Sequence, residues 1–135
     1  MTIIYDHNVH TDTYSSSTNR SNVVQYRHWF DYKACEWKHA IDYVLAFTYE
    51  HKTYTYRDDD IYNIKLRGCD HANFWYYPDF DQNRREERCM DITEYEHYFD
   101  EEQQRGVHKF TQTDGTVMTF WEEYLGTLTI SSADF

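Results

Sequence analysis

Residues 22–49 constrain the fold more than any other part of the chain. Their apolar side chains recur at steps of three or four, which is the period of one face of an α-helix. The positions with this spacing are Val23, Tyr26, Phe30, Ala34, Trp37, Ile41, Val44 and Thr48. The pattern predicts one long amphipathic helix with a buried face. Val24, Tyr26, His28, Phe30 and Tyr32 also alternate as a strand would, so a break near Tyr32 is the alternative.

A second helix, shorter and acidic, is predicted over residues 91–105. Thr93 and Glu96 have the spacing of a capping box, and Gly106 stands where a helix would end. Ile92, Tyr95 and Phe99 form a narrow apolar stripe. We therefore expect the rest of this helix to face solvent.

Shorter segments favour β-strands. Residues 53–57 and 61–67 alternate on either side of three aspartates, which predicts an antiparallel hairpin. Asp114-Gly115 between two strand-like runs favours a hairpin with a two-residue type I′ turn. Further strands are expected at residues 2–5, 74–77 and 125–131.

Together these segments predict an α+β fold, in which one long amphipathic helix packs across a mostly antiparallel sheet beside the shorter acidic helix. Residues 1–135 are expected to form a single compact domain, with a mobile polar segment at residues 6–21. We find no internal repeat in the sequence. The expected layout resembles that of cystatin-like and NTF2-like domains.

The excess of negative over positive charge lies entirely in residues 58–135. The net charge is −11, and the 24 acidic residues include six before position 58, where there are also six Lys and Arg. Direct binding to nucleic acid or to an anionic membrane is therefore not expected, because phosphate contacts need Lys and Arg. A basic protein is the natural partner. With no signal peptide and no apolar run of membrane-spanning length, we expect a cytoplasmic protein.

The sequence holds no catalytic motif, and we expect a non-catalytic protein. The four glycines at positions 68, 106, 115 and 126 lie too far apart for a phosphate-binding loop. Two Cys and two His offer the donor set of a zinc site, namely Cys35, His39, Cys69 and His71. Isolated cysteines are more often small buried apolar residues, so no cofactor is expected and zinc is the alternative.

Acidic and aromatic residues in the second half form the main candidate binding surface. They are Asp58, Asp59, Asp60, Trp75, Tyr76, Asp91, Glu94, Glu96, Asp100, Glu101 and Glu102. In composition the chain is similar to the small acidic inhibitors that phages use against restriction or CRISPR nucleases. That similarity implies that the carboxylates imitate nucleic-acid phosphates and dock on the basic groove of a nuclease or another nucleic-acid enzyme, with a ring of Trp75 or Tyr76 as anchor.

Two alternatives remain open. In the first, the carboxylates serve only to solvate an exposed face. In the second, the chain is a small zinc-stabilised or aromatic-lined ligand-binding domain, with an enzyme as one form of it. The sequence predicts no oligomeric state.

Overall fold

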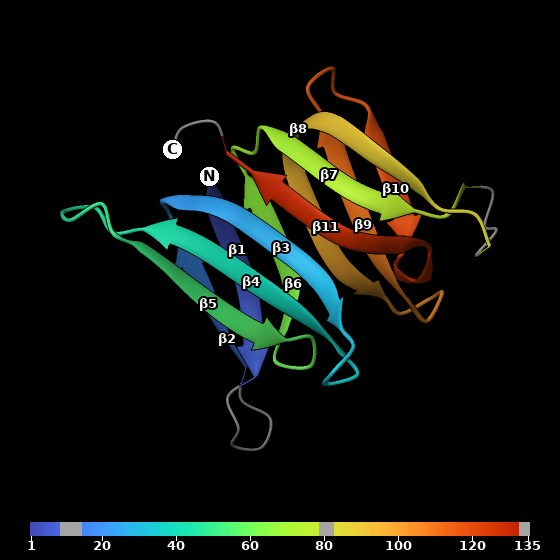
Figure 1. Cartoon of the computed structure of the whole chain (residues 1–135), viewed down its shortest axis with the longest axis horizontal. Helices are drawn as coiled ribbons and strands as arrows, with labels where there is room; N and C mark the ends of the chain where they lie inside the picture. Colours follow the sequence, from blue (N-terminus) through green and yellow to red (C-terminus); the bar gives the residue numbers. More distant parts are fainter. Residues whose placement is uncertain (9–14, 79–82, 133–135) are drawn as a thin grey trace.

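A computed structural model describes residues 1–8, 15–78 and 83–132, and in these residues the chain folds almost entirely into antiparallel strands (Figure 1). The expected α+β class is therefore wrong, and so is its likeness to cystatin-like and NTF2-like layouts. The strands are β1 (Thr2–Asn8), β2 (Ser15–Arg20), β3 (Val23–Asp31), β4 (Glu36–Val44), β5 (His51–Arg57), β6 (Ile61–Arg67), β7 (His71–Tyr76), β8 (Glu86–Asp100), β9 (Arg105–Gln112), β10 (Val117–Trp121) and β11 (Leu125–Ser131). A short 3-10 turn, η2 (Glu122–Tyr124), precedes β11.

The strands form one antiparallel sheet that folds over on itself at β8. The first part of β8 pairs with β7, and its second part pairs with β6 and β9. One arm of the sheet therefore has the order β2-β1-β6-β8-β9-β10, and the other has the order β8-β7-β11-β3-β4-β5. Figure 1 shows β7, β11, β3, β4 and β5 side by side, with β1, β2 and β6 behind them. The core lies between the two arms.

The topology contains an internal duplication that we did not find in the sequence. The pairings β1–β2, β1–β6, β3–β4 and β4–β5 of the first half recur as β7–β8, β7–β11, β8–β9 and β9–β10 of the second. The register of pairing also recurs. Trp29 is opposite Lys38, and Tyr98 is opposite Val107; each residue of the second pair lies 69 positions after its counterpart in the first. The second half thus repeats the first, and each arm holds strands from both halves.

The long helix expected at residues 22–49 is wrong, and β3, a turn and β4 take its place. A β-bulge between Val23 and Gln25 inserts one residue, so the buried side chains are Val23, Tyr26 and His28. The spacing between successive buried residues is thus three and then two, which in the sequence resembles the period of a helix. The alternation from Tyr26 to Phe30 was the correct signal.

The second helix, expected at residues 91–105, is wrong for the same reason. Its residues belong to β8, the following turn and the first residue of β9, and a bulge between Ile92 and Glu94 again turns a step of two into a step of three. Both turns are closed by an aspartate: Asp31 Oδ1 accepts hydrogen bonds from the N–H groups of Lys33 and Ala34, as Asp100 Oδ1 does from those of Glu102 and Gln103. An aspartate that binds the amides two and three residues on resembles a helix start in sequence.

The strands predicted from the sequence are largely present, but one predicted pairing between them is wrong. Residues 53–57 and 61–67 are strands, but β5 pairs with β4 and β6 pairs with β1 and β8, so the expected hairpin is wrong. The β9–β10 hairpin and the last strand are confirmed. The turn at Asp114-Gly115 is not type I′, because only Gly115 has the positive φ that both central residues would need. Of the segment at residues 6–21, residues 15–20 form β2, and residues 9–14 lie outside the described residues.

Candidate metal centre

Four histidine side chains meet in the interior of the protein. His28 and His39 face each other across β3 and β4, and His97 and His108 face each other across β8 and β9. His28, His39 and His108 are completely buried, and the side chain of His97 is only 11% exposed. The two pairs are equivalent in the duplicated topology, with 69 residues between matching members. The inward faces of two equivalent hairpins therefore bring all four rings together.

The four imidazole rings pack as one cluster. The ring centroids of His97 and His108 are 4.3 Å apart with nearly parallel planes, and those of His28 and His39 are 4.5 Å apart. Across the two halves, the His28 centroid lies 5.3 Å from that of His97 and 5.4 Å from that of His108. The four rings are thus in contact with one another within and across the two halves.

Two buried tyrosines, one in each half, form hydrogen bonds with Nδ1 of His39 and of His108. The Tyr26 hydroxyl lies 2.7 Å from Nδ1 of His39, and the Tyr95 hydroxyl lies 2.7 Å from Nδ1 of His108. Burial raises the pKa of both tyrosines well above the ordinary value, so both hydroxyls stay protonated. Because Nδ1 is occupied in each ring, Nε2 is the atom left for another partner.

A carboxylate from each half completes the cluster. Oδ1 of Asp58 lies 2.7 Å from Nε2 of His39 and 3.8 Å from Nε2 of His28. Oε1 of Glu122 lies 3.4 Å from Nε2 of His97, without the alignment of a hydrogen bond. Asp58 follows β5 and Glu122 follows β10, so the two carboxylates are also equivalent in the duplication.

Burial disfavours the charged form of three of the histidines, and the cluster is incompletely hydrogen-bonded. Burial lowers the pKa of His28 and His108 well below the ordinary value, and the neighbouring histidines lower it further. Burial also lowers the pKa of His39, although the hydrogen bond to Asp58 opposes this. Both nitrogens of His28 and Nε2 of His108 are buried without a hydrogen-bond partner. A buried polar atom without a hydrogen-bond partner lowers the stability of the fold by about 1–3 kcal/mol. We therefore expect these nitrogens to have a bound partner such as an ion.

The donor atoms fall into two groups, each arranged closely enough to bind one metal ion. His28, His39 and Asp58 make one set and His97, His108 and Glu122 the other, and the donor atoms of each set all lie within 4.8 Å of one another. Ligands about 2.0–2.1 Å from a tetrahedral zinc ion would be roughly 3.3 Å apart, which falls within the donor separations given above. Neutral imidazole and carboxylate are donors that Zn²⁺ and other divalent transition metals accept. Two histidines and one carboxylate leave coordination positions open.

A cavity of about 400 Å³ opens onto the less buried side of the cluster. Among its lining residues are Asp58, Tyr62, His97, Phe99, Glu101 and Glu122. The carboxylates of both sets therefore face this cavity, whereas His28, His39 and His108 lie behind them in the core. A cation could reach the cluster by this route, and three acidic residues line it.

Three of the four residues in the alternative zinc set considered from the sequence lie elsewhere. His39 belongs to the histidine cluster, but Cys35 lies exposed in the turn between β3 and β4. Cys69 is buried between β6 and β7, and His71 is paired with Asp91. Neither of the two ligand groups in the described part of the chain contains a cysteine.

The structure brings only some of the predicted acidic residues together. Asp58 and Glu101 line the same cavity, and Asp59 and Asp60 share the turn with Asp58, as Glu102 does with Glu101. Along β8, however, Glu94 faces Arg67, and Glu96 lies between Lys65 and Lys109. Asp91 is exposed beside His71, and Asp100 lies at the far end of the strand. The face of β8 is thus a ladder of opposite charges and not a uniformly negative surface.

The expected aromatic anchors already have partners within the chain. Trp75 is 37% exposed, and the guanidinium of Arg85 lies 4.7 Å from the centre of its ring. The hydroxyl of Tyr76 donates a hydrogen bond to Glu86. An incoming protein would have to displace Arg85 or use the free edge of Trp75.

The sequence did contain a signal for the histidine cluster. The order Tyr-x-His followed eleven residues later by His occurs at Tyr26, His28 and His39, and recurs at Tyr95, His97 and His108. A search for apolar periodicity overlooks this repeat, because histidines are polar residues that here occupy inward positions of two hairpins.

No family model, curated protein or solved structure matches this chain. Within the described residues, no helix has the length and apolar character needed to cross a membrane.

Proposed function

We propose that the protein binds divalent transition-metal cations in the histidine cluster, with one cation for each half of the duplicated fold. The observation that carries this proposal is a set of neutral, buried imidazole nitrogens that have no hydrogen-bond partner in the protein. Without a bound partner, burial of four histidines in the core is unfavourable to folding, because apolar side chains would pack there without any cost of desolvation. A bound cation satisfies the Nε2 atoms and uses the neutral form that burial enforces.

Zinc is the first candidate for the cation. Its sites with open positions use three protein ligands, and two histidines with one carboxylate are among the sets that it accepts. The hydroxyls of Tyr26 and Tyr95 act behind the ligands, because they fix the rings of His39 and His108 through Nδ1. The open positions would face the cavity lined by Asp58 and Glu122, where water or another small ligand has access.

Metal content and a cobalt titration test the proposal. The purified protein, freed of metal with a chelator, should take up about two Co²⁺ per chain and give the visible absorption of cobalt bound by nitrogen and oxygen. His28→Gln and His108→Gln should each remove about one equivalent, because each takes a donor from one set only. His71→Gln is the matched control, since His71 lies outside both sets. A folded protein that takes up no stoichiometric Co²⁺ or Zn²⁺ would exclude this function.

A second candidate is the acidic inhibitor of a nucleic-acid enzyme. Support for it comes from the end of the molecule where Asp58, Glu101 and Glu122 line one cavity and the turns carrying Asp59 and Glu102 adjoin it. A basic partner captured at low salt should be released as salt rises, and Glu101→Lys with Glu102→Lys should weaken its capture. Glu86→Lys with Glu87→Lys is the control, at the other end of β8. Equal capture by both double variants would reject the inhibitor.

A further inference from the structure

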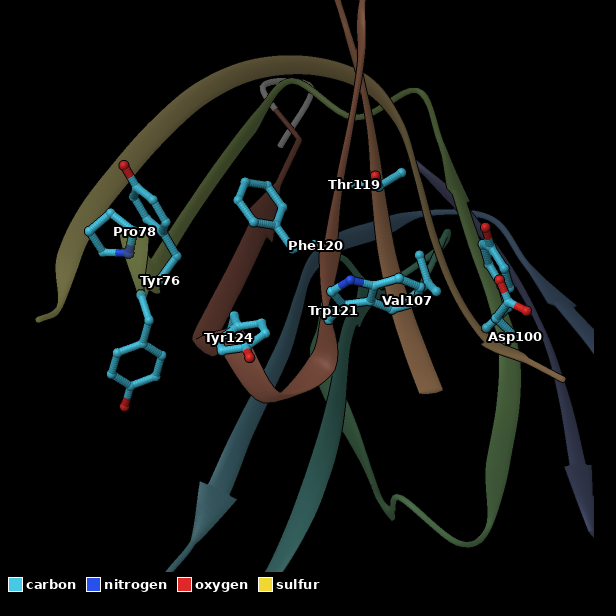
Figure 2. Close-up of a pocket in the computed structure, with 10 residues that line it drawn as sticks. Tyr76, Pro78, Asp100, Val107, Thr119, Phe120, Trp121 and Tyr124 are labelled. Carbon is cyan, nitrogen blue, oxygen red and sulfur yellow. The ribbon is translucent and has the colours of Figure 1, made fainter. Parts of the chain in front are cut away.

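A second cavity, separate from the histidine cluster, lies where the connection after β7 meets β9 and β10. Its volume is about 460 Å³, which is within the usual range for a small-molecule site. Six aromatic residues contribute to its wall, namely Tyr76, Tyr77, Tyr98, Phe120, Trp121 and Tyr124. Figure 2 shows Trp121 in the middle of the cavity wall, with Asp100 at one side and Tyr76, Phe120 and Tyr124 toward the other.

Among the described residues that line this cavity, one carries a formal charge. It is Asp100, and no Lys, Arg or His occurs in the part of the lining that the structure describes. Oδ1 of Asp100 accepts the two turn hydrogen bonds, and no Lys, Arg or His of the described residues forms an ion pair with this carboxylate. A carboxylate beside the negative faces of aromatic rings favours a cation over any other ligand.

The other half of the molecule indicates what this carboxylate lacks. Asp31 is the equivalent of Asp100, and Lys38 is the equivalent of Val107. Nζ of Lys38 lies 2.7 Å from Oδ2 of Asp31, while Oδ1 of Asp31 binds the turn amides as Oδ1 of Asp100 does. In the first half, therefore, an ammonium group of the chain itself neutralises the turn aspartate.

In the second half Val107 takes the place of this lysine, and Arg105 takes the place of Glu36 opposite the turn aspartate. Val107 cannot pair with Asp100, and Trp121 stands where the first half has Arg57. Arg105 lies outside the cavity lining, with its guanidinium 4.1 Å from the centre of the Trp121 ring and paired with Glu123. Trp121 thus already contacts one cation of the chain, and Arg105 is occupied by this ring and by Glu123.

We propose that this cavity binds a small organic ammonium ion. The positive group takes the place beside Asp100 that the Lys38 ammonium takes beside Asp31, and its alkyl groups contact the faces of Trp121 and the neighbouring tyrosines. A methylated ammonium fits best, because the wall supplies apolar and aromatic surface around a single charge. This site does not depend on the metal centre, since the two cavities share no metal ligand.

Choline and its uncharged analogue 3,3-dimethylbutan-1-ol, titrated by calorimetry and tryptophan fluorescence, test the charge directly. Choline should bind saturably, and the analogue of the same shape should bind roughly tenfold or more weakly. Asp100→Asn keeps an oxygen for the turn amides and should weaken choline binding by a similar factor. Asp31→Asn, the equivalent change in the first half, should leave choline binding unchanged.

Val107→Lys is the decisive variant. It recreates the Lys38 arrangement in the second half, so the new ammonium should pair with Asp100 and abolish choline binding. Circular dichroism establishes that each variant is folded, and if Val107→Lys is not, Asp100→Asn against Asp31→Asn still decides. Absence of saturable choline binding, equal affinity for the uncharged analogue, or equal loss in Asp31→Asn and Asp100→Asn would overturn the proposal.

Discussion

Trp37 and Gly106 occupy equivalent positions in the two halves of the fold, 69 residues apart, but their surroundings differ. The ring of Trp37 stacks on His28 with centroids 4.8 Å apart. At Gly106 no side chain is present, and Glu122 fills the space. The absence of a side chain at 106 is therefore what lets the longer carboxylate reach its histidines.

Gly106→Ala should damage the second ligand set and leave the first intact. An added Cβ would overlap the carboxylate of Glu122 and lie 3.0 Å from its Cδ and 3.1 Å from its Cβ, so the side chain must move. Cobalt uptake should fall from about two equivalents to about one. Gly126→Ala is the control, because its Cβ would make only ordinary contacts of 3.5 Å with Trp75. Full uptake by Gly106→Ala would show that Glu122 is not a ligand.

Removal of either tyrosine hydroxyl behind the histidines should weaken metal binding. Tyr26→Phe and Tyr95→Phe keep the ring packing but release Nδ1 of His39 or His108. Groups that orient a ligand in this way typically change metal affinity by about 10–100-fold. Competition with a chromophoric chelator measures the affinity, and the exposed Tyr49→Phe provides the control. Affinities equal to that of the unaltered protein would remove the tyrosines from the site.

Metal should raise the thermal stability of the chain. A ligand that binds only the folded state, present at about 100 times its Kd, adds roughly 2.7 kcal/mol. For a chain of 135 residues this corresponds to an increase in Tm of roughly 10 °C. Differential scanning fluorimetry with Zn²⁺, and then with excess chelator, checks both directions. An unchanged Tm at saturating zinc would contradict binding to the folded state.

The three cysteines should differ in their reaction with a thiol reagent. Burial raises the pKa of Cys69 to about 12, above the ordinary value, so at pH 8 its reactive thiolate is scarce. Cys35 and Cys89 are exposed and free. In the native protein two thiols should react quickly and Cys69 slowly, with all three fast in denaturant. Because the pKa is raised, the lag of Cys69 should persist until the pH approaches this value, and Cys69→Ser should abolish the slow phase.

Much of the strand content was visible in the sequence, whereas the pairing of the strands was not. Residues 61–67, 107–121 and 125–131 show their strands through alternation and turn residues. The two helices were mispredicted because bulges after Val23 and Ile92 change the spacing of buried residues from two to three. Pairing is decided over long distances in the chain, and local periodicity carries no information about it.

The site was only partly predictable, for a related reason. His39 and Asp58 were both singled out, one for zinc and one for a protein partner, yet nothing local indicates that they lie 2.7 Å apart. Their contact requires β4 to pair with β5, which then places the following turn over the histidines. The repeated order of Tyr26, His28 and His39 was the available signal, and it is recognisable only when the two halves are compared.

The fold has the architecture of a pair of subunits that exchange strands, with the unbroken 15-residue β8 of one half matching the separate strands β2 and β3 of the other. A true homodimer of this kind would carry every substitution twice. In a single polypeptide each copy changes alone, so Lys38 can persist in one copy while Val107 stands in the other. Asymmetry of this kind allows one half to serve as an internal reference for how the other half differs.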